Sequence, residues 1–228
     1  MTQPNHNHLQ PITLPQQTKL SKSVPLRAVL FDVDGTLLDY RRAQMEAVGY
    51  DGKLLELVNS PGVQSYEARG VPEPQGELKE FLEGYFQRLS MQGALMPGVR
   101  ETLEALKGKT RFALVSNGSG RVQEARLAIG GIIDYFPVRV YSRDEGVAKP
   151  DPRILSITLE RLGVLPEQAV FVGDSAKSDM AAAQAVGVDF IWFRPDGRFD
   201  SPGKRIAEVT ELVQLPELLA RQSGEGEK

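Results

Sequence analysis

Short apolar runs that stop at turn residues recur along the chain. The first covers Leu26–Phe31 and ends at Asp32–Gly35, a pattern that indicates a buried strand leading into a turn. Four later runs have the same form: Arg111–Val115, Val138–Tyr141, Ala169–Val172 and Phe190–Phe193. Helical patterns lie between them, over Val99–Lys107, Arg121–Ile129, Pro152–Leu162 and Asp179–Val186. This alternation predicts a Rossmann-like α/β fold with three layers, in which helices cover both faces of a mainly parallel sheet.

One interval, residues 40–96, breaks the alternation. It contains a helical pattern at Tyr40–Tyr50, a weaker one at Lys53–Asn59, and a strong one with apolar residues at helical spacing from Leu78 to Leu89. The Pro- and Gly-rich stretch Ser60–Gly76 is expected to be loop. We therefore expect an α/β core formed by residues 26–39 and 97–222, with a small helical insertion after the first strand.

The two ends of the chain lack the periodicity of a packed element. Residues 1–25 are rich in Gln, Asn, Pro and Thr, and residues 223–228 are short and polar. We expect both to be flexible tails, and the first has no apolar stretch of the kind found in signal peptides. His6 and His8 lie in the N-terminal tail, where a metal site is not expected.

Composition excludes several classes of protein. The 228 residues include no Cys, so disulfides, thiolate metal sites and a cysteine nucleophile are excluded. The 27 basic and 30 acidic residues are nearly balanced, which argues against a nucleic-acid partner. No apolar run approaches the roughly 18 residues of a membrane span. We expect a cytoplasmic protein that does not act at membranes, either a monomer or a weak homodimer.

Polar side chains follow the predicted strands at the point where each strand ends. Asp32 and Asp34 follow the first strand, Ser116 follows the second, Asp174 follows the fourth, and Lys149 lies on the connection after the third. Because ligands bind beyond the carboxyl ends of parallel strands, these groups are expected to converge. Three close carboxylates would shift their pKa values to stay neutral unless a cation is present. Oxygen ligands favour Mg²⁺, which binds one or two carboxylates together with a substrate phosphate.

Asp32 and Asp34 can divide the work of phosphoryl transfer. Their i, i+2 spacing on an extended segment directs both side chains to one side. One carboxylate can attack phosphorus while the other protonates the leaving oxygen and later deprotonates water. Gly35 permits a sharp turn that brings backbone N–H groups to the phosphate. The alternative is a plain turn in which Asp and Gly have only their usual turn roles.

The other motifs also have purely structural interpretations. Ser116–Gly120 can bind phosphate or begin a helix, Lys149 can be a solvated lysine, and Asp179 can be a helix cap. The functional interpretation is favoured because all four motifs fall at successive strand ends of one sheet.

Together these motifs resemble those of the haloacid-dehalogenase superfamily of phosphohydrolases, over roughly Leu26–Leu219. The resemblance implies that Asp32 is the nucleophile that forms an aspartyl-phosphate, that Asp34 is the general acid/base, and that Ser116 and Lys149 bind the transferred phosphoryl oxygens. It implies Mg²⁺ held by the Asp32 carboxylate, the Asp34 backbone carbonyl and Asp174. The supporting residues of the four motifs are Gly35, Thr36, Asn117, Gly118, Gly173, Ser175 and Asp179.

The same resemblance narrows the reaction. Carbon–halogen hydrolysis in this superfamily proceeds without a second carboxyl two residues after the first, so Asp34 favours a phosphate ester. The insertion resembles the first cap class, whose members act mainly on small phosphorylated metabolites such as sugar phosphates, phosphoglycolate or nucleoside monophosphates. Tyr40, Arg41 and Arg42 follow the first motif and could contact the leaving group, although Arg41 and Arg42 equally suit a solvated helix face.

Three alternatives remain at this point. A phosphomutase on the same scaffold would return the phosphoryl group to its substrate. A receiver-type signalling module, with Asp144 as the phosphate acceptor, also combines Asp, a hydroxyl, Lys and Mg²⁺, but leaves the insertion and Asp174 without a role. The third alternative is a non-catalytic phosphate-binding protein.

Overall fold

A single parallel sheet forms the centre of the molecule. The computed structural model describes residues 24–197 and 207–222, and in this part of the chain the strand order is β3-β2-β1-β4-β5-β6, with every neighbouring pair parallel. The strands are β1 Ala28–Phe31, β2 Arg111–Ser116, β3 Val138–Tyr141, β4 Ala169–Gly173, β5 Asp189–Phe193 and β6 Ala207–Val209. The sequence predicted the first five strands and missed β6. Of the expected tails at 1–25 and 223–228, residues 1–23, which include His6 and His8, and residues 223–228 lie outside the described residues.

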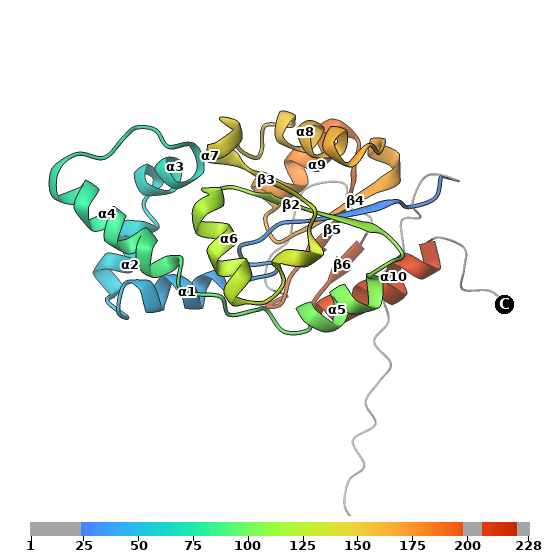
Figure 1. Ribbon diagram of the computed structural model, residues 1–228, viewed down its shortest axis with the longest axis horizontal. Helices are drawn as coiled ribbons and strands as arrows, with labels where there is room; N and C mark the ends of the chain where they lie inside the picture. Colours follow the sequence, from blue (N-terminus) through green and yellow to red (C-terminus); the bar gives the residue numbers. More distant parts are fainter. Residues whose placement is uncertain (1–23, 198–206, 223–228) are drawn as a thin grey trace, which may run out of the picture.

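Helices cover both faces of this sheet (Figure 1). Alternate residues of each strand point to opposite faces: Val29 and Phe31 pack against α5 and α10, whereas Ala28 and Leu30 pack against α8 and α9. The helices of the core are α5 Val99–Leu106, α6 Gly120–Ile129, α7 Ser142–Glu145, α8 Arg153–Leu162, α9 Ala181–Val186 and α10 Leu215–Gln222. The predicted three-layer, Rossmann-like α/β fold is confirmed.

Short 3-10 and π turns complete the core. The 3-10 turns are Ile133–Tyr135, Pro166–Gln168 and Leu212–Gln214, and a π turn covers Ala176–Met180 immediately before α9. Within the described residues, none of the helices is both long and apolar enough to cross a membrane.

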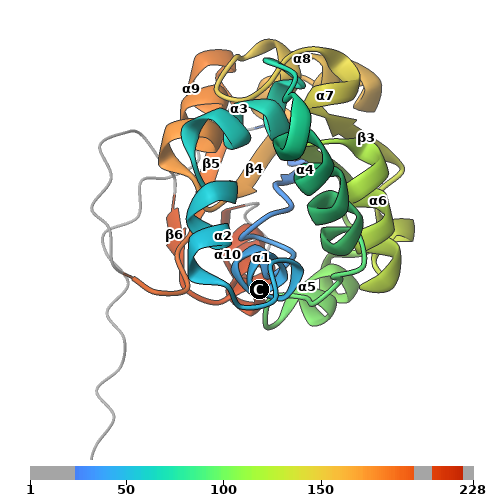
Figure 2. The same ribbon diagram turned by 90° about the vertical axis from the view of Figure 1, so that its left-hand side faces the viewer.

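Four helices lie between β1 and α5 in the chain. They are to one side of the sheet in Figure 1 and face the viewer in Figure 2. They are α1 Tyr40–Ala47, α2 Gly52–Val58, α3 Pro61–Arg69 and α4 Gly76–Leu89. Their buried side chains form a hydrophobic cluster separate from the two at the sheet, to which α6 contributes Val122. This arrangement suits the predicted helical insertion, whose bounds at residues 40 and 96 stay a prediction. We refer to α1–α4 as the inserted helices.

The prediction of a loop over Ser60–Gly76 is wrong for its first half. Residues Pro61–Arg69 form α3, with Pro61 in its first turn and Gly70 as its C-cap at φ 76°. Proline is tolerated at the first helical position because its missing N–H has no intrahelical partner there, and glycine readily adopts the left-handed conformation that ends a helix. The two residue types taken as evidence for a loop therefore mark the ends of a helix.

Candidate active site

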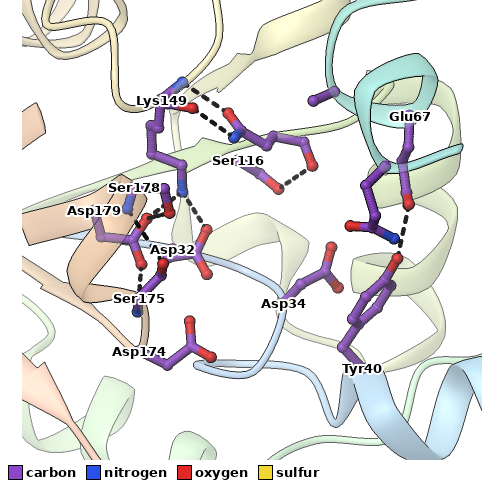
Figure 3. A pocket seen from close by; sticks show the side chains of 13 residues that line it. Asp32, Asp34, Tyr40, Glu67, Ser116, Lys149, Asp174, Ser175, Ser178 and Asp179 are labelled. Carbon is purple, nitrogen blue, oxygen red and sulfur yellow. Dashed lines mark hydrogen bonds and ion pairs between the residues drawn. The ribbon is translucent and has the colours of Figure 1, made fainter. Parts of the chain in front are cut away.

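The predicted polar residues meet in one cavity at the carboxyl ends of β1, β2 and β4 (Figure 3). The cavity has a volume of about 320 Å³, within the range of small-molecule sites. It is lined by core residues and by three residues of α3 together with Tyr40 of α1. The lining residues are Asp32, Asp34, Tyr40, Gln64, Glu67, Ala68, Ser116, Asn117, Lys149, Asp174, Ser175, Ser178 and Asp179.

Lys149 is a buried cation at the back of the cavity. Its Nζ lies 2.5 Å from Oδ1 of Asp32 and 2.8 Å from Oδ1 of Asp179, and it donates to the Val115 carbonyl at 2.8 Å. Burial alone would lower the pKa of Lys149, but the charges of Asp179 and Asp32 raise it above its ordinary value. Lys149 therefore stays protonated and gives the cavity a fixed positive charge.

Asn117 fixes the backbone from which Lys149 extends. Its Nδ2 donates to the Lys149 carbonyl at 3.0 Å, and its Oδ1 accepts from the Lys149 N–H at 2.9 Å. This two-point contact joins the loop after β2 to the loop before α8. Asn117 was predicted only as a supporting residue, and the structure gives it this positioning contact.

Asp34 is held on the other side of the cavity by two polar residues of α6. Nη1 of Arg126 and Nε2 of Gln123 both lie 2.5 Å from its carboxylate oxygens. Gln123 also donates to the Ser116 hydroxyl at 3.0 Å and accepts from Arg126 at 2.9 Å. Asp32 and Asp34 thus have separate cationic partners, Lys149 and Arg126, which fix the two carboxylates in different orientations.

The Ser142 hydroxyl links the loop after β2 to the inserted helices. It accepts a hydrogen bond from the Gly118 N–H at 2.8 Å and donates to the Ala68 carbonyl at the end of α3. Gly118, a predicted supporting residue, therefore has a backbone contact that indirectly joins the loop of Ser116 to α3.

Three carboxylates can approach one cation. Oxygen atoms of Asp32, Asp174 and Asp179 all lie within 4.8 Å of one another. Asp179 already bonds Lys149 and the Ser175 N–H at 3.0 Å, whereas no side chain of the described residues donates a hydrogen bond to the Asp174 carboxylate. The carboxylates of Asp174 and Asp32 together are a donor set of hard oxygens that suits Mg²⁺.

The electrostatics of this cluster also favour a cation. Burial raises the pKa of Asp32, and Lys149 offsets this effect only in part. The side chain of Asp174 is exposed to solvent within the cavity, but the surrounding protein atoms partly desolvate it. This desolvation and the charge of Asp179 raise the pKa of Asp174 to about 7. A divalent ion between these oxygens would stabilise both carboxylates in their ionised form.

Two glycines let the acidic residues come this close. A Cβ atom on Gly35, whose φ is +82°, would lie 2.4 Å from Oδ2 of Asp174. A Cβ atom on Gly173 would lie 2.5 Å from Oδ2 of Asp179. Any side chain at either position would displace a carboxylate of the cluster. Thr36, the next residue of the first motif, is fully buried and does not line the cavity.

Of the three residues predicted to contact the leaving group, the structure places one in the cavity. Tyr40 lines it and donates from its hydroxyl to Oε2 of Glu67 at 2.8 Å. Arg41 and Arg42 are exposed, and Arg42 pairs with Glu46 on the same helix at 2.8 Å. These two arginines thus occupy a solvated helix face, as the alternative interpretation expects.

Sequence reasoning missed several residues of the site. Glu67 and Gln64 were placed in a loop, although their i, i+3 spacing after Pro61 was the available signal. Burial raises the pKa of Glu67 to about 7, and the nearby charge of Asp34 adds to this effect. Gln123 and Arg126 are also three residues apart, but nothing in the sequence distinguishes them from solvent-exposed residues of an ordinary helix.

The fold gathers a cluster of carboxylates at one edge of a parallel sheet, and comparison with known proteins identifies the family of the chain. Residues 26–187 match the family model for haloacid dehalogenase-like hydrolases. The chain belongs to this family of hydrolases, as its motifs predicted.

Individual relatives agree with this assignment. The chain is 32% identical to a phosphorylated carbohydrates phosphatase from Thermotoga maritima over 85% of its own length and 97% of that protein. It is 31% identical to a phosphoglycolate phosphatase from Nitrosospira multiformis over 72% and 81% of the two chains. The crystal structure of the HAD-hydrolase YfnB from Bacillus subtilis has the same fold, with a TM-score of 0.72 at 23% identity, covering 86% of this chain and 99% of that one. The predicted enzyme class, a phosphatase that hydrolyses phosphate esters, is confirmed.

Proposed function

We propose that the protein is a Mg²⁺-dependent phosphatase that hydrolyses small phosphomonoesters through an aspartyl-phosphate on Asp32. The observation that carries this proposal is the separation of Asp32 and Asp34 in one cavity, where Lys149 holds one carboxylate and Arg126 holds the other. Two carboxylates with different partners are suited to different chemical roles. Phosphatases among the relatives support the same substrate class.

In the first step, a carboxylate oxygen of Asp32 attacks phosphorus and the bond to the leaving oxygen breaks. Lys149 bonds Oδ1 of Asp32 and leaves Oδ2 as the attacking atom. The ammonium of Lys149 and the hydroxyl of Ser116 both line the cavity, where they can stabilise negative charge on the transferred phosphoryl oxygens.

Asp34 moves the protons of both steps. Its protonated carboxyl gives a proton to the leaving oxygen, which departs as an alcohol. The resulting carboxylate then takes a proton from a water molecule that attacks the aspartyl-phosphate, releasing inorganic phosphate and regenerating Asp32. Arg126 and Gln123 keep the carboxylate of Asp34 in one orientation during this exchange.

The carboxylates of Asp32 and Asp174, with the backbone carbonyl of Asp34, would hold the metal ion. When bound, Mg²⁺ supplies positive charge that offsets the charge of the phosphate and of the carboxylates around it. Asp179 supports the site by holding Lys149 and the N–H of Ser175.

Phosphate release from a panel of phosphomonoesters tests the proposal. We expect release by the wild type with Mg²⁺, loss of release with a chelator, and loss in Asp32→Asn. Asp134→Asn, at an exposed position outside the cavity, is the matched control and should keep wild-type activity. Equal activity of Asp32→Asn and the control would overturn the proposal, and transfer of the phosphoryl group to a second ester without release would indicate a phosphomutase.

A further inference from the structure

The side of the cavity beyond Asp34 is formed by the inserted helices. Figure 3 shows Asp34 between Asp32 and Tyr40, with Glu67 above the Tyr40 hydroxyl. Phosphorus must lie near Asp32 and Lys149, and Asp34 must reach the leaving oxygen. The rest of the leaving group therefore extends toward Tyr40 and Glu67.

The polar atoms on this side of the cavity are mainly hydrogen-bond acceptors. The Tyr40 hydroxyl uses its proton on Glu67, which leaves its oxygen lone pairs. The amide nitrogen of Gln64 donates to the Val58 carbonyl at 2.9 Å, which leaves Oε1 of Gln64 as an acceptor. The carboxylate of Glu67 adds further acceptor positions. Because the acceptor positions outnumber the second N–H of the Gln64 amide, a leaving group that brings donors matches this side of the cavity best.

An acidic leaving group would find no cation on this side. Lys149 is the one cation among the described residues that line the cavity, and it is held by Asp32, Asp179 and the Val115 carbonyl. Arg126 is buried against Asp34 and does not line the cavity. A carboxylate or second phosphate on the leaving group would approach the charge of Glu67 with no cation of the described cavity lining free to pair with it, and burying an unpaired charge is costly.

Two arginines lie close to the aromatic residues on this side of the cavity. The guanidinium carbon of Arg126 is 5.5 Å from the centre of the Tyr40 ring, and that of Arg143 is 4.7 Å from the Tyr66 ring. Arg143 and Glu67 also line a small adjoining cavity of about 10 Å³. Because these cations partly balance Glu67, a neutral donor suits the site better than an additional ammonium group.

We propose that Glu67, together with Tyr40 and Gln64, determines substrate specificity by accepting hydroxyl groups of a neutral leaving group and excluding leaving groups that carry a carboxylate. The substrate class is therefore the monophosphates of polyols and sugars. This inference rests on the proposed phosphatase function, and it assigns the choice of substrate to the helix that the sequence did not predict.

Three esters that differ in one group provide the test. Hydroxyethyl phosphate, 2-phosphoglycolate and phosphoethanolamine place a hydroxymethyl, a carboxylate and an aminomethyl group at the same position. For the wild type, we expect kcat/KM for hydroxyethyl phosphate to exceed that for each of the other two at least about tenfold. At pH 8, above the raised pKa of Glu67 of about 7, the wild-type side chain is ionised, and in Glu67→Gln the ratio of hydroxyethyl phosphate to 2-phosphoglycolate should fall at least about fivefold because the repelling charge is gone.

A control variant and a generic substrate distinguish a failure of the specificity assignment from a failure of the phosphatase function. Glu56→Gln changes an exposed glutamate of α2 outside the cavity and should keep the wild-type ratios. If the wild type hydrolyses p-nitrophenyl phosphate but prefers 2-phosphoglycolate or phosphoethanolamine, or if Glu67→Gln leaves the ratios unchanged, the specificity assignment is overturned and the phosphatase function stands. If the wild type hydrolyses no phosphomonoester, both fall.

Discussion

Replacing Arg126 by Met should destabilise the protein far more than its single position on one helix suggests. Its Nη1 lies 2.5 Å from Asp34 and 2.9 Å from Oε1 of Gln123, its Nε donates to the Gln92 carbonyl at 3.1 Å, and its side chain is 1% exposed. Removing one partner of a buried ion pair costs about 3–5 kcal/mol because the other charge is left unpaired.

For Arg126→Met, the structure indicates a loss of unfolding free energy below that range. The Asp34 side chain is 16% exposed and keeps its hydrogen bond from Gln123, so water and the amide partly compensate the lost guanidinium. In addition, Nη2 of Arg126 is buried without a hydrogen-bond partner among the described residues, and this unfavourable desolvation disappears in the variant. We expect a loss of about 2–3 kcal/mol in the free energy of unfolding.

Urea denaturation of five proteins measures this value: the wild type, Arg126→Met, Asp34→Asn, their double variant and a control. Arg161→Met is the matched control, since Arg161 makes two contacts of 2.7 and 2.9 Å with Glu145 but is 45% exposed, and its loss should cost less than about 1 kcal/mol. In the cycle with Asp34→Asn, the double variant should be less destabilised than the sum of the single variants by about 2 kcal/mol.

Either of two results would refute this reasoning. One is a cost for Arg126→Met no greater than that of Arg161→Met. The other is strict additivity with Asp34→Asn. The kcat of Arg126→Met should also fall, because a misdirected Asp34 forfeits part of the roughly 10² to 10⁴-fold contribution of general acid–base catalysis.

Two further predictions concern the acidic groups of the cavity. Gly35→Ala should weaken Mg²⁺ binding at least about tenfold by calorimetry, because its Cβ would displace Asp174; Gly146→Ala, also at positive φ but with open space around it, should bind normally. Between about pH 4.5 and about pH 7, the folded wild type keeps a proton on Glu67 that the unfolded chain has released, so the wild type loses stability as pH rises. Glu67→Gln has no such loss, and its stability relative to the wild type should therefore increase over the same window. By urea denaturation, the gain in unfolding free energy should reach at most about 3 kcal/mol at pH 8 and be absent at pH 4. The control Glu56→Gln should show no change in this difference with pH. A gain that shrinks with rising pH would contradict the reasoning.

The sequence predicted those elements whose pattern of apolar and polar residues follows directly from which of their sides are buried. Runs such as Ala169–Val172 are apolar throughout because both faces of the sheet are covered, and the helical spacing from Leu78 to Leu89 reflects one buried side of α4. The motif residues were found because their chemistry follows each strand directly. In each case the local pattern and the final structure agree.

The residues that were missed depend on partners distant in the chain. Arg126 is buried because Asp34, 92 positions earlier, lies against it, and no local pattern encodes that contact. Helix α3 was missed because Pro61 and Gly70 were taken as interruptions, although they suit its first turn and its C-cap. Strand β6 has only three residues and forms by pairing with β5.

The central place of β1 in the sheet has a consequence for biosynthesis. Of the described strands, this one is the first to leave the ribosome, yet it pairs on one side with β2 and on the other with β4, which ends at Gly173. Until that residue has emerged, one edge of the segment that carries Asp32 has no strand beside it, and an unpaired strand edge invites association with other chains. A chain that stops before Ala169 therefore exposes the strand that leads directly into Asp32.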